Sequence, residues 1–338
     1  LKLDAPYDLV KQMRASVLVA GPLLARFRRV RVPLPGGCAI GMRPIDLHLF
    51  GFERMGAKVS QRGGDISLHS RGRLKGTRIR LRFPSVGATE NVLMAAVLAS
   101  GKTVIENVAR EPEITDLVVF LRKMGALIEG DGTATLRVQG VLRLHGAVHR
   151  VIPDRIEAGT YLIACAAAGG TIALTDAEPR HLVSLLDHLR KAGCRVTASG
   201  ASIALKAPRR TRAVDVATRP YPGFPTDLQA PWMALMALAR GDSNIHEKIF
   251  EKRFLHAAEL ARMGAHLIVE ERRVLIRGGR LSGAPVMASD LRAGAALLVA
   301  ALAAKGRPII ERVYHIDRGY ERVEEKLSSL GARIERTR

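Results

Sequence analysis

The sequence predicts an α/β protein built by duplication, in which short strands alternate with helices of two kinds. Three observations support this fold class. A helix-ending motif recurs about every seventy residues, helices rich in small apolar residues recur between its copies, and the length of 338 residues exceeds that at which a single hydrophobic core usually stops growing. We therefore expect two domains, each with repeats arranged around a centre of helices.

The helix-ending motif consists of apolar helix residues, a glycine, and then an alanine or cysteine that leads into an alternating strand pattern. Its glycines lie 69, 68, 71 and 67 residues apart, at Gly56, Gly125, Gly193, Gly264 and Gly331. Glycine suits the left-handed conformation in which many helices end, and alternation is typical of a half-buried strand. All five copies are thus predicted to end a helix and begin a strand, and residues 53–67 and 262–276 to continue through a tight turn into a second strand.

Each repeat also carries a helix of small apolar residues that is followed by a glycine and a β-branched strand. Residues 88–100 precede Gly101 and a strand at 103–105, and residues 293–304 precede a strand at 308–310. A helix that is apolar all round is predicted to be buried. One repeat therefore combines a buried helix, a second helix and about four short strands, which differs from a doubly wound sheet.

Composition limits the classes of function. The chain has 53 Lys and Arg against 32 Asp and Glu, a net charge of +21, which favours nucleic acids or phosphate-bearing ligands. The basic clusters are scattered, however, and the aromatic content of 4% is low for a surface that stacks bases. We expect no nucleic-acid partner, and a basic RNA-binding protein remains the non-enzyme alternative.

Location is predicted from the apolar pattern and the cysteines. No run of about 18 uncharged apolar residues suggests a membrane span, so no membrane partner is expected. Cys38, Cys165 and Cys194 lack the spacing of metal ligands, which favours a reducing cytoplasm and no metal site. The sequence begins at Leu1 rather than methionine, which leaves a targeting segment open.

One glycine-rich loop has the layout of a reactive centre. In Pro-Gly-Gly-Cys at 35–38 the cysteine is followed by Arg43 and Asp46, five and eight residues later. The glycines allow the backbone to expose the thiol, while the guanidinium favours the thiolate and can hold an anion. The structural alternative is a small buried cysteine beside an ordinary turn.

Polar residues collect at the predicted starts of the buried helices, where backbone N–H groups and the helix dipole favour anions. These starts lie at residues 13–16, 85–89, 155–160, 225–227 and 290–294. Helix capping by Ser, Thr or Asp explains any one of them. Together, with arginines in several, they predict a ring of helix ends that binds phosphate or carboxylate groups.

Eight segments carry motifs that resemble those of the UDP-N-acetylglucosamine 1-carboxyvinyltransferases, the MurA family of enolpyruvyl transferases. They lie at residues 35–47, 83–91, 109–113, 153–157, 224–227, 250–254, 290–293 and 315–321. The resemblance covers essentially the whole chain. Pro-Gly-Gly-Cys followed by Arg-Pro-Ile-Asp distinguishes this family from its relative in the shikimate pathway.

The resemblance implies a two-domain inside-out α/β barrel of repeated βαββαβ units, with domains at residues 1–152 and 153–338. Six units are implied and five caps are present, so we expect one unit to be missing at the N-terminal side of the first domain. The implied activity is transfer of enolpyruvate from phosphoenolpyruvate to the 3′-hydroxyl of UDP-N-acetylglucosamine, the first committed step of peptidoglycan precursor synthesis. No metal and no organic cofactor are implied.

The family's mechanism is addition followed by elimination: the sugar hydroxyl attacks C2, C3 gains a proton, and phosphate leaves a tetrahedral ketal. By resemblance, Cys38 supplies the proton to C3 or forms a covalent adduct with the substrate, and Asp227 is the base for the hydroxyl. Helix capping beside Thr226 is the structural alternative for Asp227. The cations around the anionic groups of phosphoenolpyruvate are Arg14, Arg43, Arg253, Arg292 and Arg318.

The nucleotide sugar is assigned by resemblance to segments from both predicted domains. Residues that resemble the uridine-binding segment are Arg43, Pro44, Ile45, Asp46 and Leu47. Residues that present a helix N-terminus to the diphosphate are Ser85, Val86 and Gly87. Ile249 aligns with a contact on the sugar side, and Asp227 also lies there.

The sequence departs from the family pattern at two points. The family carries a lysine followed by an asparagine close to its N-terminus, and no such pair occurs in this sequence. Phe83 stands where some members have a lysine for the nucleotide. The alternatives within the same fold are an enolpyruvyl transferase that acts on another alcohol, against which Cys38 argues, and an inactive truncated product.

Overall fold

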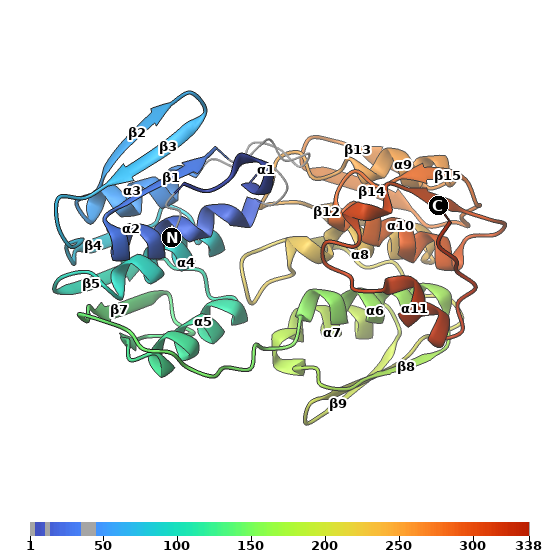
Figure 1. Cartoon of the computed structure of the whole chain (residues 1–338). Coiled ribbons are helices and arrows are strands. Elements are labelled where there is room, and N and C mark those ends of the chain that lie inside the picture. The colour runs from blue at the N-terminus through green and yellow to red at the C-terminus, as the bar shows by residue number, and fades with distance from the viewer. Residues whose placement is uncertain (1–3, 11–13, 35–44, 338) are drawn as a thin grey trace. The chain divides into compact units, whose positions relative to one another are not determined.

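The computed structural model describes residues 4–10, 14–34 and 45–337, and the chain divides into two compact units. The division falls between Ile152 and Pro153, in a stretch that forms neither helix nor strand. Each unit buries its own apolar side chains, which include Leu93 in the first unit and Trp232 in the second. Figure 1 labels many of the helices and strands of both units.

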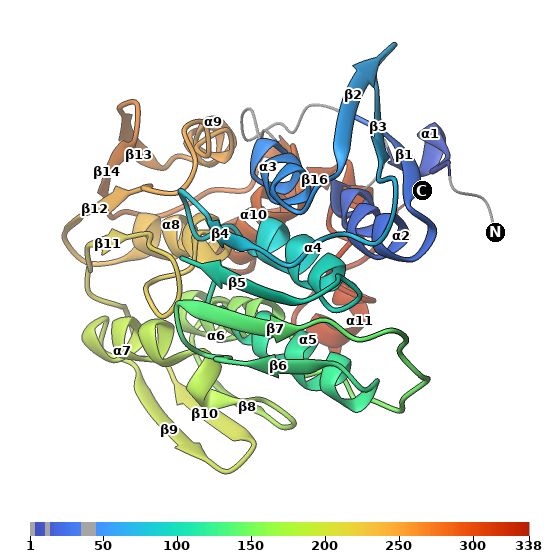
Figure 2. The same cartoon turned by 90° about the vertical axis from the view of Figure 1, so that its left-hand side faces the viewer.

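The first unit packs sheets against buried helices. Its elements, with 3-10 helices written η, are α1 (Tyr7–Val10), η1 (Arg14–Val19), α2 (Ala20–Phe27), β1 (Arg29–Pro33), α3 (Asp46–Arg54), β2 (Lys58–Arg62), β3 (Asp65–His69), β4 (Arg78–Arg80), α4 (Val86–Ala96), β5 (Lys102–Glu106), α5 (Pro112–Lys123), β6 (Leu127–Glu129) and β7 (Thr135–Gln139). The sheet β1–β3–β2 is antiparallel, whereas the sheet β4–β5–β7–β6 contains the parallel pair β4–β5. Figure 2 shows the second of these sheets alongside α4 and α5.

The parallel pair β4–β5 explains why α4 is buried. A chain that leaves one strand and returns parallel to it needs a crossover connection, and α4 is that connection. The side chains of Ala88, Val92, Leu93 and Ala96 are fully buried. The apolar helix predicted at 88–100 is therefore confirmed as α4, which begins two residues earlier and ends at Ala96.

The second unit repeats the same plan. Its elements are α6 (Arg155–Ala168), β8 (Thr171–Leu174), η2 (Pro179–His181), α7 (Val183–Lys191), β9 (Arg195–Ser199), β10 (Ser202–Lys206), β11 (Val216–Ala217), η3 (Thr226–Leu228), α8 (Gln229–Leu238), β12 (Asp242–His246), α9 (His256–Arg262), β13 (His266–Val269), β14 (Arg273–Arg277), β15 (Pro285–Met287), α10 (Leu291–Ala303), β16 (Ile309–Glu311), η4 (Val313–His315) and α11 (Val323–Ser329). The sheets are β8–β10–β9, β11–β12–β14–β13 and β15–β16. The pairs β11–β12 and β15–β16 are parallel, with α8 and α10 as their crossovers.

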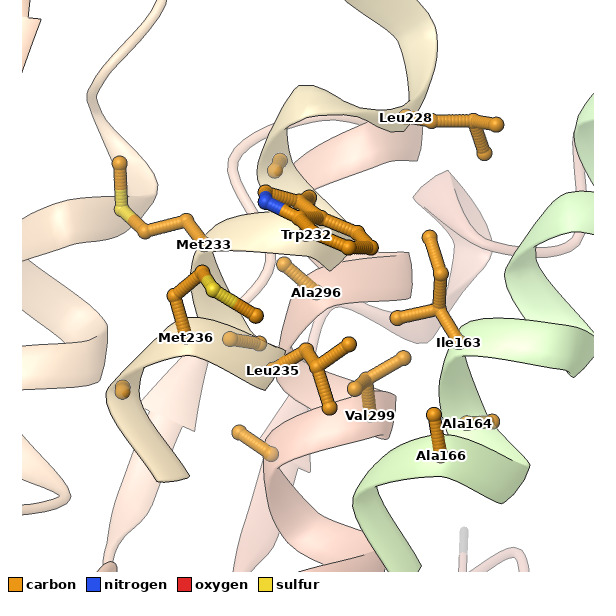
Figure 3. Close-up of a cluster of buried hydrophobic side chains, with 14 of the residues drawn as sticks. Ile163, Ala164, Ala166, Leu228, Trp232, Met233, Leu235, Met236, Ala296 and Val299 are labelled. Atoms are coloured by element: carbon orange, nitrogen blue, oxygen red, sulfur yellow. The ribbon is translucent and has the colours of Figure 1, made fainter. Parts of the chain in front are cut away.

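The helices α6, α8 and α10 pack on one another and form the centre of the second unit. Figure 3 shows Ile163 from α6, Trp232 and Leu235 from α8, and Ala296 and Val299 from α10 pointing into one cluster. All of these side chains are fully buried. Because these central helices are covered by sheets rather than by solvent, they carry almost no polar side chains along their middle turns.

The glycines of the repeated motif adopt the conformation that their spacing predicts. Their φ angles lie between 91° and 98°, in the left-handed region, at Gly56, Gly125, Gly193, Gly264 and Gly331. Each follows a helix, and the first four are followed by the predicted strands β2, β6, β9 and β13. The α/β class and the duplication predicted from the sequence are thus confirmed.

The fifth copy of the motif corrects one prediction. Residues 332–337 form no strand, although the alternating pattern predicted one after Gly331. In the other copies the strand after the cap is half of an antiparallel hairpin, as in β2–β3 and β13–β14. The described residues after Gly331 are too few to include a second hairpin strand, so the first one has no partner there.

The sequence predicts no membrane-spanning segment. None of the helices in the described ranges combines the length and the apolar character that crossing a bilayer requires.

Candidate active site

Asp227 lies on the short η3 turn that leads into α8. Neither η3 nor α8 begins with a side-chain cap, so the capping role considered for Asp227 is not observed. Its side chain is 40% exposed, and its Oδ1 accepts hydrogen bonds from two arginines of other elements. A carboxylate at this position is therefore held by distant residues rather than by its own helix.

Arg253 comes from the loop between β12 and α9 and is buried, with 4% of its side chain exposed. Its Nη2 donates to Asp227 Oδ1 at 2.7 Å, and its Nη1 donates to Thr226 Oγ1 at 3.0 Å. Its guanidinium carbon lies 5.1 Å from the ring centroid of Phe250. The planar group is thus fixed by a charge, a hydroxyl and an aromatic face.

Arg292 reaches the same carboxylate from the start of α10. Asp290 caps this helix and accepts from the backbone N–H of Arg292 at 2.9 Å, so the arginine leaves the first turn in a fixed direction. Its Nε lies 3.4 Å from Asp227 Oδ1. Burial disfavours its charge, but Asp227 and Tyr320 outweigh burial and raise the pKa of Arg292 above its usual value.

A chain of hydroxyl groups holds the other end of Arg292. Its Nη1 donates to the Tyr320 hydroxyl at 3.2 Å, and that hydroxyl lies 2.9 Å from Thr160 Oγ1. Thr160 uses its own proton to donate to the carbonyl of Ile156, so Tyr320 must be the donor to Thr160. Burial raises the pKa of Tyr320 and keeps this phenol protonated.

His256, the first residue of α9, is buried near Arg253 and Asp290. Its pKa is lowered to about 4, mainly by burial; the charge of Asp290 opposes this shift, and the charge of Arg253 adds to it. The imidazole is therefore neutral at physiological pH. It adds no charge beside Arg253.

These positions allow two kinds of chemistry. Two guanidinium groups that converge on one oxygen can instead hold a phosphate or carboxylate of a ligand, because both anions match the planar donor geometry. The half-exposed carboxylate between them can accept a proton from a hydroxyl group. Asp227, Arg253 and Arg292, which lie 65 positions apart at most, are thus brought together within the second unit.

The remaining predicted residues of the second unit differ in exposure. Arg318 is exposed and precedes Tyr320 by two positions, between η4 and α11. Ile249 is half-buried, and its backbone N–H donates to Glu247 Oε1 at 2.8 Å. Ile249 is thus tied to the loop that precedes Arg253, whereas Arg318 lies in the segment that carries the partner of Arg292.

The first unit holds the residues predicted to bind the nucleotide. Ile45 is buried as the N-cap of α3, Leu47 is half-buried, and Asp46, the first helical residue, forms an ion pair with Arg82. Cys38, Arg43 and Pro44 lie outside the described residues, as does the side chain of Arg14, which begins η1. Of the loop that the sequence predicts to be reactive, the structure thus describes only the last residues.

Ser85, Val86 and Gly87 form the start of α4, as predicted. Ser85 is the N-cap and its Oγ accepts from the backbone N–H of Ala88 at 3.4 Å. A Cβ atom on Gly87 would lie 3.3 Å from Cε1 of His48, so a larger residue would press on that buried ring. His48 is in turn held by Asn91, whose Nδ2 lies 3.0 Å from the imidazole Nδ1.

Sequence reasoning missed Glu247, Tyr320 and Thr160 as parts of this site. Tyr320 lies inside the motif at 315–321 and Thr160 inside the predicted helix start at 155–160, so the sequence marked both segments but assigned neither residue a role. Glu247 lies outside every motif. Its full burial and its hydrogen bonds become apparent only in the folded chain.

The donor groups of the site suit anions rather than cations. Within the ranges that the structure describes, no group of three or more His, Cys, Asp and Glu side chains is arranged to hold a metal ion. The charged centre around Asp227 instead combines one carboxylate with two arginines, which is a donor set for anions.

Comparison with known proteins adds a family context to this geometry. The family model described as EPSP synthase (3-phosphoshikimate 1-carboxyvinyltransferase) matches residues 1–327. Proteins named UDP-N-acetylglucosamine 1-carboxyvinyltransferase are 57% identical over 334 residues in Paramagnetospirillum magneticum and 54% identical over 331 residues in Endomicrobium trichonymphae. Each match covers 98% of this chain and 77% or 79% of the relative, respectively.

Solved structures give the same picture of the fold. The enolpyruvyl transferase NikO from Streptomyces tendae matches with a TM-score of 0.88 at 28% identity, over 99% of this chain and 80% of that chain. An EPSP synthase from Acinetobacter baumannii matches with a TM-score of 0.72 at 19% identity, over 96% and 78%. The second similarity concerns the fold alone.

Proposed function

From the premise that this chain belongs to the enolpyruvyl transferase family, and within it to the UDP-N-acetylglucosamine 1-carboxyvinyltransferases, we propose its reaction. It transfers enolpyruvate from phosphoenolpyruvate to the 3′-hydroxyl of UDP-N-acetylglucosamine and releases inorganic phosphate. The observation that carries the proposal is the convergence of Arg253 and Arg292 on the carboxylate of Asp227. This reaction needs cations for two anionic groups beside a base for a hydroxyl.

Asp227 is the base in this proposal. As the hydroxyl oxygen forms a bond to C2 of phosphoenolpyruvate, its proton passes to the Asp227 carboxylate, while C3 takes a proton from the Cys38 thiol. In the elimination step the bond from C2 to the phosphate oxygen breaks, C3 returns a proton to the Cys38 thiolate, and the phosphate leaves with the proton that Asp227 had accepted. The half-exposed position of Asp227 supports this role, because an incoming hydroxyl can reach its oxygens.

Arg253 and Arg292 bind the phosphate and carboxylate of phosphoenolpyruvate, together with Arg14, Arg43 and Arg318. The raised pKa of Arg292 supports this role, since a permanently charged guanidinium stabilises the negative charge that develops on the leaving phosphate. Tyr320 and Thr160 fix its orientation before the substrate arrives. Such preorganisation lowers the cost of ordering the site during the reaction.

By their motifs, residues of the first unit are assigned to the nucleotide and Ile249 is assigned to the sugar. The start of α4 at Ser85, Val86 and Gly87 offers backbone N–H groups and the positive end of the helix dipole to the diphosphate. Ile45, Asp46 and Leu47, with Arg43 and Pro44 before them, contact the uridine. Both substrates are small molecules, and the proposed addition and elimination use only proton transfer and the binding of anions, so the proposal includes neither a metal nor an organic cofactor.

The proposed reaction takes place in the cytoplasm. Cys165 and Cys194 are free thiols in the described structure, and burial raises the pKa of Cys194 to about 11. Free, protonated thiols of this kind suit a reducing compartment.

The experiment follows phosphate release from the full chain mixed with both substrates, and compares the variant D227N with D187N. Asp187 is an exposed aspartate of the same unit that pairs with Arg190 on α7, so it is a matched control. We expect D227N to lower kcat by about a hundredfold or more and D187N to leave it unchanged, because only the first removes the base. Phosphate release that does not require the nucleotide sugar, or equal rates for both variants, would refute the proposal.

A further inference from the structure

Glu247 is a fully buried carboxylate whose hydrogen bonds the proposed reaction has not used. It follows β12, and 0% of the residue is exposed. Its Oε1 accepts from the hydroxyl of Thr218 at 2.8 Å and from the backbone N–H groups of Ile249 and Phe250 at 2.8 and 3.1 Å. Its Oε2 accepts from the hydroxyl of Thr226 at 2.9 Å.

A buried carboxylate normally needs a positive partner, because burial without one is costly. Among the residues that the structure describes, no Lys or Arg forms an ion pair with Glu247, and all its donors are neutral. A cation is connected to Glu247 through a single hydroxyl group. Arg253 Nη1 donates to Thr226 Oγ1 at 3.0 Å, and the same hydroxyl donates to Glu247.

The direction of these two bonds is fixed by chemistry. A guanidinium can only donate, so the Thr226 oxygen must accept from Arg253, and its single proton is then free to point at the carboxylate. Hydrogen bonds to charged groups are the stronger ones, and this hydroxyl has a charged group on each side. Thr226 therefore couples the charge of Glu247 to that of Arg253.

We propose that Glu247 is a positioning residue for phosphoenolpyruvate, which holds Arg253 through Thr226 and fixes the loop that carries Ile249; this inference rests on the proposed function. Arg253 then has two anchors, Asp227 and Thr226. When Asp227 turns to the sugar hydroxyl, the Thr226–Glu247 pair keeps the guanidinium in place. Arg292 is held differently, since its hydroxyl chain ends at the neutral carbonyl of Ile156 rather than at a charge.

The test uses the full chain with the variants T226V, T226S and E247Q and the double variant T226V/E247Q. It measures KM for each substrate by phosphate release. T226V removes the hydroxyl and keeps the shape, so we expect KM for phosphoenolpyruvate to rise about tenfold, with KM for the nucleotide sugar unchanged and T226S close to wild type. The control S243A removes a buried hydroxyl of β12 that has no hydrogen-bond partner in the described structure, and it leaves both KM values unchanged.

The variant E247Q distinguishes a positioning role of Glu247 from a purely electrostatic effect of its charge. Loss of a buried negative charge would by itself strengthen the binding of an anion and lower KM. The glutamine oxygen stays with the three donors that Oε1 now accepts from, so the glutamine nitrogen faces Thr226 and cannot accept its hydroxyl proton, and loss of this anchor raises KM. We expect a rise of about tenfold, and the double variant to be no worse than either single one, because both changes break one link. Additive effects, or a lowered KM in E247Q, overturn the proposal.

A binding measurement keeps the test independent of turnover. If the wild-type chain releases no phosphate, the proposed reaction fails by itself, and the positioning role is decided by the rise in unfolding temperature that phosphoenolpyruvate alone produces. We expect this rise in the wild-type chain and in T226S, and a smaller one in T226V and E247Q. No rise in the wild-type chain, or an equal rise in all four proteins, overturns the inference.

Discussion

Replacing Glu90 with glutamine is expected to stabilise the first unit above neutral pH and to leave its stability unchanged in mild acid. Glu90 lies on α4, where burial raises its pKa from 4.5 to about 7, and the charges of Glu113 and Glu111 contribute to that rise. In the unfolded chain this carboxyl keeps its ordinary pKa. The folded state therefore binds the proton more tightly than the unfolded state does.

The sign and size of the effect follow from linkage. Between about pH 4.5 and 7 the folded chain carries more protons at this site, so the free energy of unfolding falls as the pH rises. Each pKa unit corresponds to about 1.4 kcal/mol, so ionising Glu90 costs the folded state on the order of 3 kcal/mol at about pH 8. E90Q removes this cost and should gain up to that amount, while at about pH 4.5 the two proteins should be equally stable.

The assay must report on the first unit. The chain has one tryptophan, Trp232, which lies in the second unit, so its fluorescence cannot follow α4. Hydrogen exchange of peptides from 86–96, measured against urea at several pH values, gives the stability of the helix itself. The control variant E129Q makes the same substitution at an exposed glutamate, on β6 of the same unit. Parallel profiles for wild type and E90Q would show that the reasoning about Glu90 is wrong.

Three further predictions concern other parts of the chain. Burial lowers the pKa of His256 to about 4, so the free energy of unfolding of the second unit should be highest above about pH 6.5 and should fall by on the order of 3 kcal/mol towards pH 4. Urea unfolding followed by Trp232 fluorescence should show this fall, and the variant H256N should lack it. Gly56 has a φ of 91°, and no atom lies within 4 Å of the position that an alanine methyl group would take. The variant G56A should therefore lower the free energy of unfolding in urea by about 1 kcal/mol through backbone strain alone. The control G72A, at a glycine without a positive φ, should lower it less. Cys38 should be alkylated by an epoxide phosphonate such as fosfomycin, as mass spectrometry can show, whereas C38D should resist modification and still release phosphate, because a carboxylic acid can also deliver a proton; modification of C38D at another residue would contradict this assignment.

The repeated architecture could be predicted because its signals are local. A glycine that must adopt a positive φ, such as Gly125, marks the end of a helix whatever surrounds it, and the same holds for the other copies. The buried helices were equally readable, since α4 and α10 consist mostly of small apolar residues, a pattern that can be recognised without knowledge of their neighbours. The fifth strand was the exception, because a strand needs a partner as well as a pattern.

The candidate site could be predicted only where a residue belongs to a motif. Asp227, Arg253 and Arg292 were found in this way, and the structure brings them together. Their supports could not be found, because Thr160 and Tyr320 are 160 positions apart and become a pair only after folding. Glu247 belongs to no motif, and an isolated glutamate in a sequence is ordinarily a solvated surface charge.

The sequence by itself determined the class of the fold, the positions of its caps and buried helices, and the family, and it predicted those candidate site residues that belong to motifs. The tertiary structure alone decided which side chain holds which. Burial and neighbouring charges shift the pKa values of Glu90 and His256. Arg253 is linked through the Thr226 hydroxyl to the buried carboxylate of Glu247. The physical reason is range: backbone conformation and apolar periodicity act between near neighbours in the chain, whereas desolvation, ion pairing and hydrogen bonding depend on groups that only the folded chain brings together.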